Sequence, residues 1–143
     1  MTSPQLRTAV IGVGHFGRFH AEKYASLPAA RLVGVVDRDQ SRAAEVARAT
    51  GAQAFADHRE LFGKVDAVSI VVPTHAHFEV ARDCLEAGLH VLIEKPITET
   101  LEQADALIAL ASRRRLVLQV GHLQRFLLQR IGGETLIANP LYI

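Results

Sequence analysis

Apolar residues in this chain gather in short runs of strand length that alternate with helical patterns. The runs lie at residues 8–12, 31–37, 66–72, 90–94 and 116–120, and they are apolar at consecutive positions rather than at every second one. Strands of this kind are buried on both faces. The pattern therefore predicts a parallel sheet that is covered by helices on both sides.

Helical spacing of apolar residues separates these runs. It occurs at residues 16–27, 40–50, 76–87 and 101–112, and Gly51 and Gly88 stand where helices commonly end. A short strand at 53–55 and a helical turn at 57–62 complete the first half. The alternation predicts an α/β fold, a doubly wound parallel sheet, as one domain over residues 1–122.

The rhythm changes over residues 123–143. The stretch "LQRFLLQRI" is helix-like, "GGE" interrupts it, and "NPLYI" is typical of a turn that leads into a strand. That strand has nothing left in this sequence to pair with unless it adds to a sheet edge. We expect a crossover helix here, followed by the start of a second α/β domain that is truncated or absent.

Three glycines lie directly between the first predicted strand and the first predicted helix. Gly12, Gly14 and Gly17 fit the pattern GxGxxG, and Asp37 closes the second strand 20 positions after Gly17. In a dinucleotide-binding Rossmann turn, the first glycine permits the tight turn, the second lets a pyrophosphate approach the backbone, and the third lets the helix pack closely. The amides at the start of the helix then bind the phosphates.

Residues near this turn bear on which dinucleotide binds. The Asp37 carboxylate can accept hydrogen bonds from both hydroxyls of the adenosine ribose and would repel a 2′-phosphate, which favours NAD over NADP. Arg38 argues against this preference for NAD, because a guanidinium can pair with the 2′-phosphate of NADP. We expect His15 and Phe16, inside the turn, to face the cofactor, His15 through its backbone N–H.

Two other interpretations of the glycine turn stay open. A plain strand-to-helix turn followed by a surface aspartate would give the same sequence pattern. A methyltransferase that uses S-adenosylmethionine has the same topology, with a glycine turn after its first strand and an acid after its second. The complete pattern of three glycines favours the dinucleotide.

Three later motifs follow strands at the edge where open α/β sheets bind ligands. They are "VVPTHAH" at 71–77, "LIEKPIT" at 92–98 and "VGHLQRF" at 120–126. With them the chain resembles, over essentially its whole length, the Gfo/Idh/MocA family of nicotinamide-dependent oxidoreductases, which act on sugars, inositols and nucleotide sugars. Within that family, the motif "VGHLQRF" is most similar to the nucleotide-sugar 3-dehydrogenases.

The triplet Glu94, Lys95 and Pro96 is the most specific element of this resemblance. A lysine at the exit of a buried strand can have its charge partly desolvated, which suits it to proton transfer or to binding a substrate hydroxyl. The alternative is an ion pair between Glu94 and Lys95 before a proline turn. The resemblance implies that Lys95 is the catalytic residue near the nicotinamide and that the triplet helps to seat the nicotinamide ribose.

The loop after the fourth strand, the one at 66–72, supplies further cofactor candidates. Pro73, Thr74 and His77 match the family's loop beside the cofactor, although asparagine is common there where Thr74 stands. We expect His77 to form a hydrogen bond at the start of a helix rather than to act as a base. His75 and His77 form an HxH pair, but no third ligand is apparent, so we expect no metal.

The last motif supplies the substrate candidates. By the resemblance, His122 and Arg125 lie where the chain leaves the sixth strand toward the second domain, and a surface ion pair is the alternative for Arg125. The family often has asparagine and proline where Leu127 and Leu128 stand here.

Composition narrows the class of partner. Sixteen basic residues against fifteen acidic ones give a net charge of +1, which indicates neither nucleic acid nor an anionic membrane as a partner. No apolar stretch approaches the roughly 20 residues of a membrane span, and the first residues lack the order of a secretory signal. The single cysteine, Cys84, is expected in the core and fits a reducing compartment. We expect a cytoplasmic protein with a small-molecule partner.

Two functions stay open from the sequence. In the family, the catalytic base, the substrate pocket and the oligomer contact come from the second domain, so we expect a homo-oligomer when the chain is full length. The chain is expected to be an NAD-dependent dehydrogenase of a sugar-like substrate, or its cofactor-binding half. The alternative is a non-catalytic NAD-binding module, which would have no need of the cation at Lys95. His20, His58 and His90 have no partner that the sequence identifies.

Overall fold

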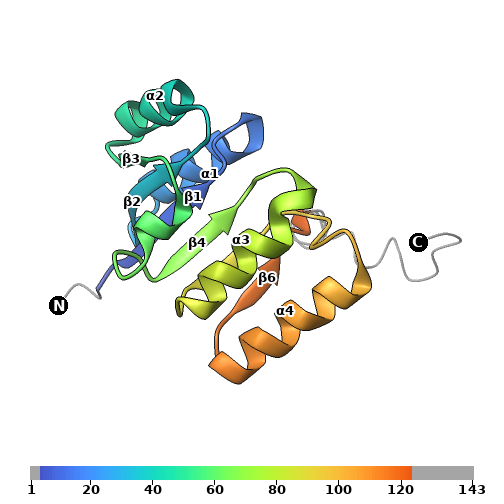
Figure 1. The fold of residues 1–143 in the computed structure, drawn as a ribbon. Helices are drawn as coiled ribbons and strands as arrows, with labels where there is room; N and C mark the ends of the chain where they lie inside the picture. Colours follow the sequence, from blue (N-terminus) through green and yellow to red (C-terminus); the bar gives the residue numbers. More distant parts are fainter. Residues whose placement is uncertain (1–3, 124–143) are drawn as a thin grey trace, which may run out of the picture.

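The computed structural model describes residues 4–123, and its strands form one six-stranded parallel sheet in the order β3-β2-β1-β4-β5-β6 (Figure 1). The strands are β1 (Leu6–Ile11), β2 (Ala30–Val36), β3 (Gln53–Phe55), β4 (Ala67–Ile70), β5 (His90–Ile93) and β6 (Leu118–Val120). The helices are α1 (His15–Ser26), α2 (Gln40–Thr50), α3 (Thr74–Glu86) and α4 (Leu101–Arg114), with a 3₁₀ turn η1 (His58–Leu61). The predicted doubly wound parallel sheet is confirmed.

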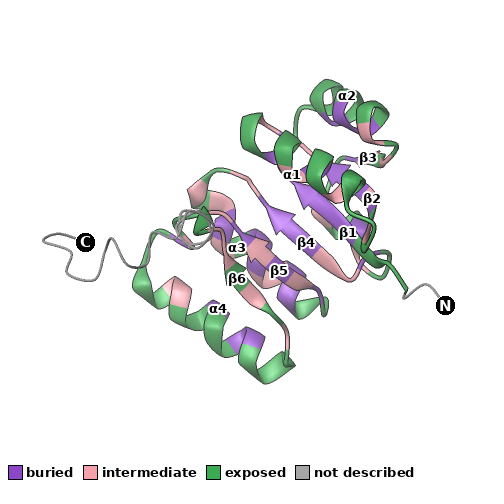
Figure 2. Cartoon of the chain, turned by 180° about the vertical axis from the view of Figure 1, so that it is seen from behind, coloured by how far each residue is buried: buried purple, intermediate pink, exposed green. Residues whose placement is uncertain are grey.

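Two hydrophobic cores lie on opposite faces of this sheet. Within β1, Ile11 packs in one core and its neighbour Val10 in the other. Helices α3 and α4 close the first core, where Leu85 and Leu107 are fully buried, and Ala21 of α1 closes the second. Figure 2 shows the central strands β1 and β4 as buried. Burial on both faces is why these strands read as unbroken apolar runs.

Helix ends match the residues that the sequence marks as caps, and the boundaries of α1, α3 and α4 differ from the predicted ones by one or two residues. Gly51 ends α2 in the left-handed region, at φ 73°, and Gly88 follows α3 at φ 84°. The Asp39 side chain caps the start of α2 by accepting hydrogen bonds from two backbone amides. Helix α3 begins at Thr74, earlier than the predicted residue 76, because Pro73 takes the N-cap position with a backbone suited to a helix start.

The sheet order reverses direction between β1 and β4, at the centre of the sheet. All strands are parallel, so their carboxyl ends lie at one edge. In open α/β sheets, ligands bind in the crevice at such a reversal. The loops after β1, β2 and β4 meet at this point.

The glycine turn between β1 and α1 has the geometry that its three positions predict. Gly12 has φ 88°, and a Cβ there would lie 2.6 Å from the carbonyl oxygen of Val71. A Cβ at Gly17 would lie 1.8 Å from the carbonyl oxygen of Gly12, so α1 approaches the turn more closely than any side chain permits. A Cβ at Gly14 would meet no protein atom within 4 Å.

We expect Gly17→Ala to destabilise the fold by about 3 kcal/mol or more, because the added carbon meets backbone that cannot move aside alone. Urea unfolding followed by circular dichroism measures this change. Gly14→Ala is the matched control, and should cost no more than about 1 kcal/mol, the usual penalty of alanine at an N-cap. Equal unfolding midpoints for the two variants would contradict the close approach of α1.

Candidate functional site

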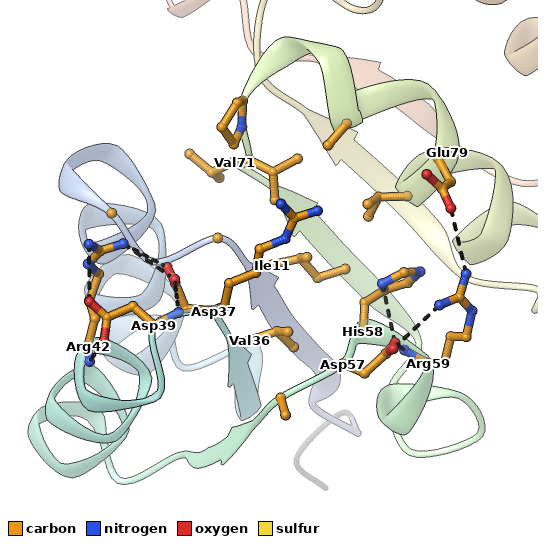
Figure 3. Close-up of a pocket in the computed structure, with 18 of the residues that line it drawn as sticks. Ile11, Val36, Asp37, Asp39, Arg42, Asp57, His58, Arg59, Val71 and Glu79 are labelled. Carbon is orange, nitrogen blue, oxygen red and sulfur yellow. Dashed lines mark hydrogen bonds and ion pairs between the residues drawn. The ribbon is translucent and has the colours of Figure 1, made fainter.

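A cavity of about 670 Å³ opens at the carboxyl edge of the sheet, over the reversal of strand order (Figure 3). The loops after β1, β2, β3 and β4 line it, together with the start of α3. The predicted site residues in this lining are Gly12, Gly14, Asp37, Arg38 and Pro73. The structure therefore brings the glycine turn and the acid of β2 to one cavity.

The start of α1 supplies the cavity with unpartnered backbone donors. The first helical hydrogen bond runs from the amide of Arg18 to the carbonyl of Gly14, at 3.0 Å. Gly14 occupies the N-cap position, and no side chain among the described residues caps this helix. The N–H groups of the first turn, with the positive end of the helix dipole, are thus left for an anion. Gly14 leaves open space through which that anion can approach.

Asp37 is held rigidly at the end of β2. Its Oδ2 accepts a hydrogen bond from the amide of Val13 at 2.9 Å, and its Oδ1 accepts one from the amide of Asp39 at 2.9 Å. The side chain of Asp37 is 10% exposed and also pairs with Arg42 at 3.3 Å. One of these bonds comes from the glycine turn itself, so the position of the carboxylate is tied to that of the turn.

The opposite end of the cavity is formed by residues that the sequence analysis missed. Asp57, His58 and Arg59 follow β3, and Glu79 lies on α3. Figure 3 shows them across the cavity from Asp37. Their signal in the sequence was only their place after a strand, at the edge where Asp37 also lies. No motif marks them.

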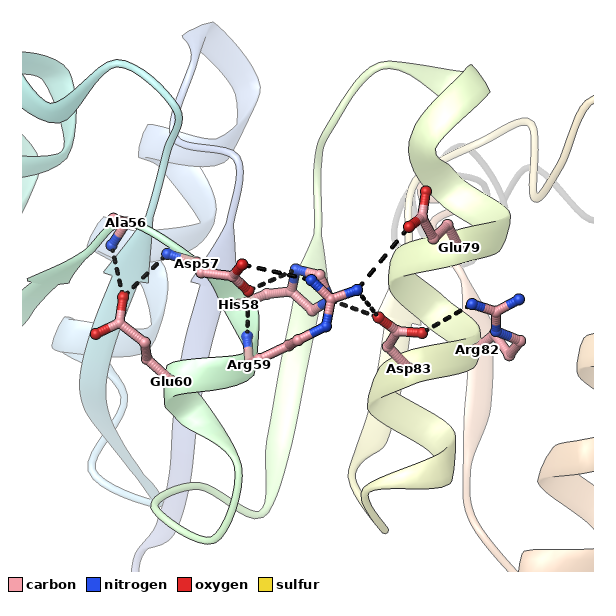
Figure 4. A network of polar contacts seen from close by, with 8 residues as sticks. All are labelled: Ala56, Asp57, His58, Arg59, Glu60, Glu79, Arg82 and Asp83. Carbon is pink, nitrogen blue, oxygen red and sulfur yellow. Dashed lines mark hydrogen bonds and ion pairs between the residues drawn. The ribbon is translucent and has the colours of Figure 1, made fainter.

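A network centred on Asp83 of α3 holds this end together (Figure 4). The Asp83 carboxylate accepts a hydrogen bond from Arg59 Nη2 at 2.6 Å and from Arg82 Nη2 at 3.1 Å, and it lies 3.2 Å from His58 Nε2. Burial by itself would raise the pKa of Asp83, but the hydrogen bonds from Arg82 and His58 and the charge of Arg59 outweigh it and lower the pKa. The network ties the segment after β3 to α3.

The loops after β4 and β5 are joined by His77. This side chain is 1% exposed, and its ring nitrogens lie 2.9 Å from the carbonyl oxygens of Val72 and Pro96. The expectation that His77 forms hydrogen bonds at the start of a helix is confirmed. Pro96 follows Lys95 through a cis peptide bond. His77 therefore holds the backbone of the EKP triplet beside the loop that lines the cavity.

Glu94 has a different partner from the one considered for it. Its Oε1 lies 3.2 Å from Nε2 of His20 on α1, and its Oε2 accepts a hydrogen bond from the amide of Lys95 at 3.3 Å. A Cβ at Gly121 would lie 2.8 Å from Oε1, so the carboxylate also fills the space over that glycine. No ion pair joins Glu94 to the Lys95 side chain within residues 4–123, and Lys95 is exposed rather than desolvated by these residues.

Several predicted site residues are not among the residues that line the cavity. His15 and Phe16 are exposed on the first turn of α1, where the His15 ring packs edge-on against Phe16 and Phe19. Thr74 begins α3 next to Pro73, and His122 is exposed after β6. Arg125 lies outside the described residues, as does nearly all of the segment 123–143 that we assigned to the crossover and second domain.

Three histidines that the sequence left without partners have them in the structure. His20 contacts Glu94, His58 contacts Asp83, and Nδ1 of His90 accepts a hydrogen bond from the amide of Val117 at 3.0 Å. The sequence does not identify these partners, because each of them lies on an element far along the chain.

The prediction that Cys84 lies in the core is confirmed. The residue is on the buried face of α3, and burial raises the pKa of its thiol to about 12. Across residues 4–123, no set of three or more metal-ligating side chains converges, and no helix in that range is long and apolar enough to span a bilayer.

The fold and the cavity define a class of protein, an α/β domain of the Rossmann type with its cavity at the reversal of strand order. Comparison with known proteins narrows the class. Residues 6–122 match the family model for the Gfo/Idh/MocA oxidoreductases, described as an oxidoreductase family with an NAD-binding Rossmann fold. The chain belongs to this family, and the resemblance drawn from its motifs is confirmed.

Individual relatives agree with this assignment. UDP-N-acetylglucosamine 3-dehydrogenase of Acidithiobacillus ferrooxidans is 54% identical over 120 residues, which make up 84% of this chain and 38% of the relative. A solved structure of that enzyme has a TM-score of 0.82 at 53% identity and covers 86% of this chain and 40% of its own. The scyllo-inositol 2-dehydrogenase (NAD(+)) of Bacillus subtilis is 36% identical over 126 residues, which are 85% of this chain and 37% of the relative.

A further solved structure contains the cofactor. It is the scyllo-inositol dehydrogenase of Lactobacillus casei with bound NAD(H) and scyllo-inositol, with a TM-score of 0.81 at 26% identity, covering 86% of this chain and 38% of its own. The present chain thus spans about two fifths of the length of the relatives that it matches.

The pKa of Asp83 predicts how stability depends on pH. A carboxyl group whose pKa is lowered by folding stabilises the fold above its unfolded pKa of about 3.9, and this contribution is lost as pH falls through the folded pKa. We expect Asp83→Asn to lower the free energy of unfolding by about 1–3 kcal/mol at pH 7. The difference from the unaltered protein should shrink below about pH 4.

Urea unfolding at a series of pH values measures this difference. Asp105→Asn, at an exposed position on α4, is the matched control and should change stability little at any pH. A loss in Asp83→Asn that stayed constant from pH 7 to pH 3 would show that the charge of Asp83 contributes nothing.

Proposed function

We propose that this chain is the NAD-binding part of a dehydrogenase that transfers a hydride between a nicotinamide and a hydroxyl carbon of a sugar, cyclitol or nucleotide sugar. The observation that carries the proposal is the joint placement of the uncapped start of α1 and the Asp37 carboxylate on one cavity. The relatives whose names specify a nucleotide sugar or an inositol support the substrate class.

Two kinds of group at the cavity bind the dinucleotide: the amide donors at the start of α1 and the Asp37 carboxylate after β2. The first-turn amides of α1, including those of His15, Phe16 and Gly17, bind the pyrophosphate through N–H donors and the helix dipole. Asp37 accepts hydrogen bonds from the ribose hydroxyls and repels a 2′-phosphate, so NAD is preferred to NADP. Arg38 lines the same end of the cavity and limits the size of this preference.

The EKP triplet supplies the reactive end of the proposed site. The nicotinamide, when bound, supplies the group that accepts or donates the hydride. Lys95 is exposed and free to reach a substrate hydroxyl, while Glu94 and Pro96 are fixed through His20 and His77. Lys95 then binds that hydroxyl and assists movement of its proton. Thr74 completes the loop beside the cofactor.

Other proposed contacts with the substrate lie beyond the cavity. His122 and Arg125 are proposed substrate contacts, by their place after β6. In a longer protein, a second domain supplies the catalytic base and the surface through which copies associate. The alternative function is a non-catalytic NAD-binding module.

We expect NAD to bind more tightly than NADP, and Asp37→Ala to reduce this preference about tenfold, because two hydrogen bonds to a carboxylate are lost for NAD and a repulsion is lost for NADP. Isothermal titration with each dinucleotide measures the ratio. Asp105→Ala, on the exposed face of α4, is the control. Equal affinity of the unaltered protein for both dinucleotides would remove the assigned role of Asp37.

We expect Lys95→Ala to leave the affinity for NAD within about threefold of the unaltered value, because the phosphate and ribose contacts lie elsewhere. In a longer form that includes a substrate domain, the same change should reduce kcat by at least about 100-fold. Exposed Lys64, substituted in the same way, is the control. Turnover retained by the Lys95 variant would exclude the lysine from catalysis.

A further inference from the structure

The Asp37 carboxylate has no acceptor position left over. Its two oxygens accept the amides of Val13 and Asp39, each at 2.9 Å, and Nη1 of Arg42 lies 3.3 Å from Oδ1 and 3.4 Å from Oδ2. A carboxylate offers about four acceptor sites. Two amide bonds and the forked contact with Arg42 occupy all of them.

A ribose that uses Asp37 needs two of these positions for its hydroxyls. The two amides belong to backbone at the glycine turn and at the start of α2, so they cannot leave. Arg42 can leave, because its side chain is 48% exposed and already reaches a second acceptor, Oδ2 of Asp39, at 3.4 Å. Figure 3 shows Arg42 beside Asp37 and Asp39, and Arg42 is therefore the group that a ribose would displace.

The displaced guanidinium stays next to the ribose. Arg42 lines the same cavity as Asp37, and it touches the very oxygens that would accept the ribose hydroxyls. A phosphate on such a hydroxyl would carry nearly two negative charges at neutral pH. Guanidinium groups bind phosphate through two parallel hydrogen bonds, with planar geometry that an ammonium group lacks.

We propose that Arg42 sets the choice of cofactor in this chain: it competes with the ribose of NAD for Asp37 and, once released, binds the 2′-phosphate of NADP. This inference rests on the proposed function, since it takes the cavity to be a dinucleotide site. NADP is then a second, weaker cofactor, admitted by Arg42 against the repulsion from Asp37. Arg42 is a specificity-determining residue whose two actions both narrow the preference for NAD.

Titration calorimetry of the chain with NAD and with NADP tests this role. Arg42→Gln should weaken NADP about tenfold or more and leave NAD unchanged or tighter, so that the ratio of the two affinities rises. Arg42→Lys keeps the charge without the planar fork and should fall between the two. Arg48→Gln, at an exposed position on the same helix outside the cavity, is the matched control and should change neither affinity.

The possible results separate cleanly. Weaker NAD binding in Arg42→Gln would mean that Arg42 supports the Asp37 site rather than competing for it, and would overturn the inference. So would unchanged NADP binding in Arg42→Gln, above all if Arg38→Gln weakened NADP instead. Circular dichroism establishes that each variant is folded. If the unaltered chain bound neither dinucleotide, the proposed function itself would fail, a result that no Arg42 variant can produce.

Discussion

The contact of α1 with the backbone of Gly12 is the constraint on which the site depends. A Cβ at position 17 would overlap the Gly12 carbonyl, so only glycine lets the helix begin this close to the end of β1. That approach aims the uncapped amides of the first turn at the cavity. The turn also lies against Val71, directly after β4, which places the proposed phosphate end of the site at the reversal of strand order.

Around this turn, the cavity is framed by two kinds of polar contact. At one end, backbone amides hold the Asp37 carboxylate, and the half-exposed side chain of Arg42 pairs with it. At the other end, charged side chains hold one another through Asp83, which joins the segment after β3 to α3. The first arrangement leaves a group that a ligand can displace. The second makes a wall whose stability depends on charge and therefore on pH.

The EKP triplet is held in place by two side chains, His77 and His20, that do not line the cavity. His77 links the loops after β4 and β5 through two carbonyl groups, and His20 holds Glu94 against the end of β6. These contacts leave Lys95 as the exposed member of the EKP triplet. The fold thus fixes the backbone of the triplet while its cation stays available.

The sequence alone determined the class of fold, the glycine turn and the acid at the end of β2. These features depend on local backbone geometry and on burial of strands on both faces, and both leave a direct pattern in the residues. Only the tertiary structure decided which side chains meet. The Glu94 side chain contacts His20, 74 positions away, rather than the side chain of its neighbour Lys95, and Asp83 contacts His58 across 25 positions. The physical reason is that the sheet sets the order of the strands in space, and side chains far apart in the chain become neighbours only when that order exists.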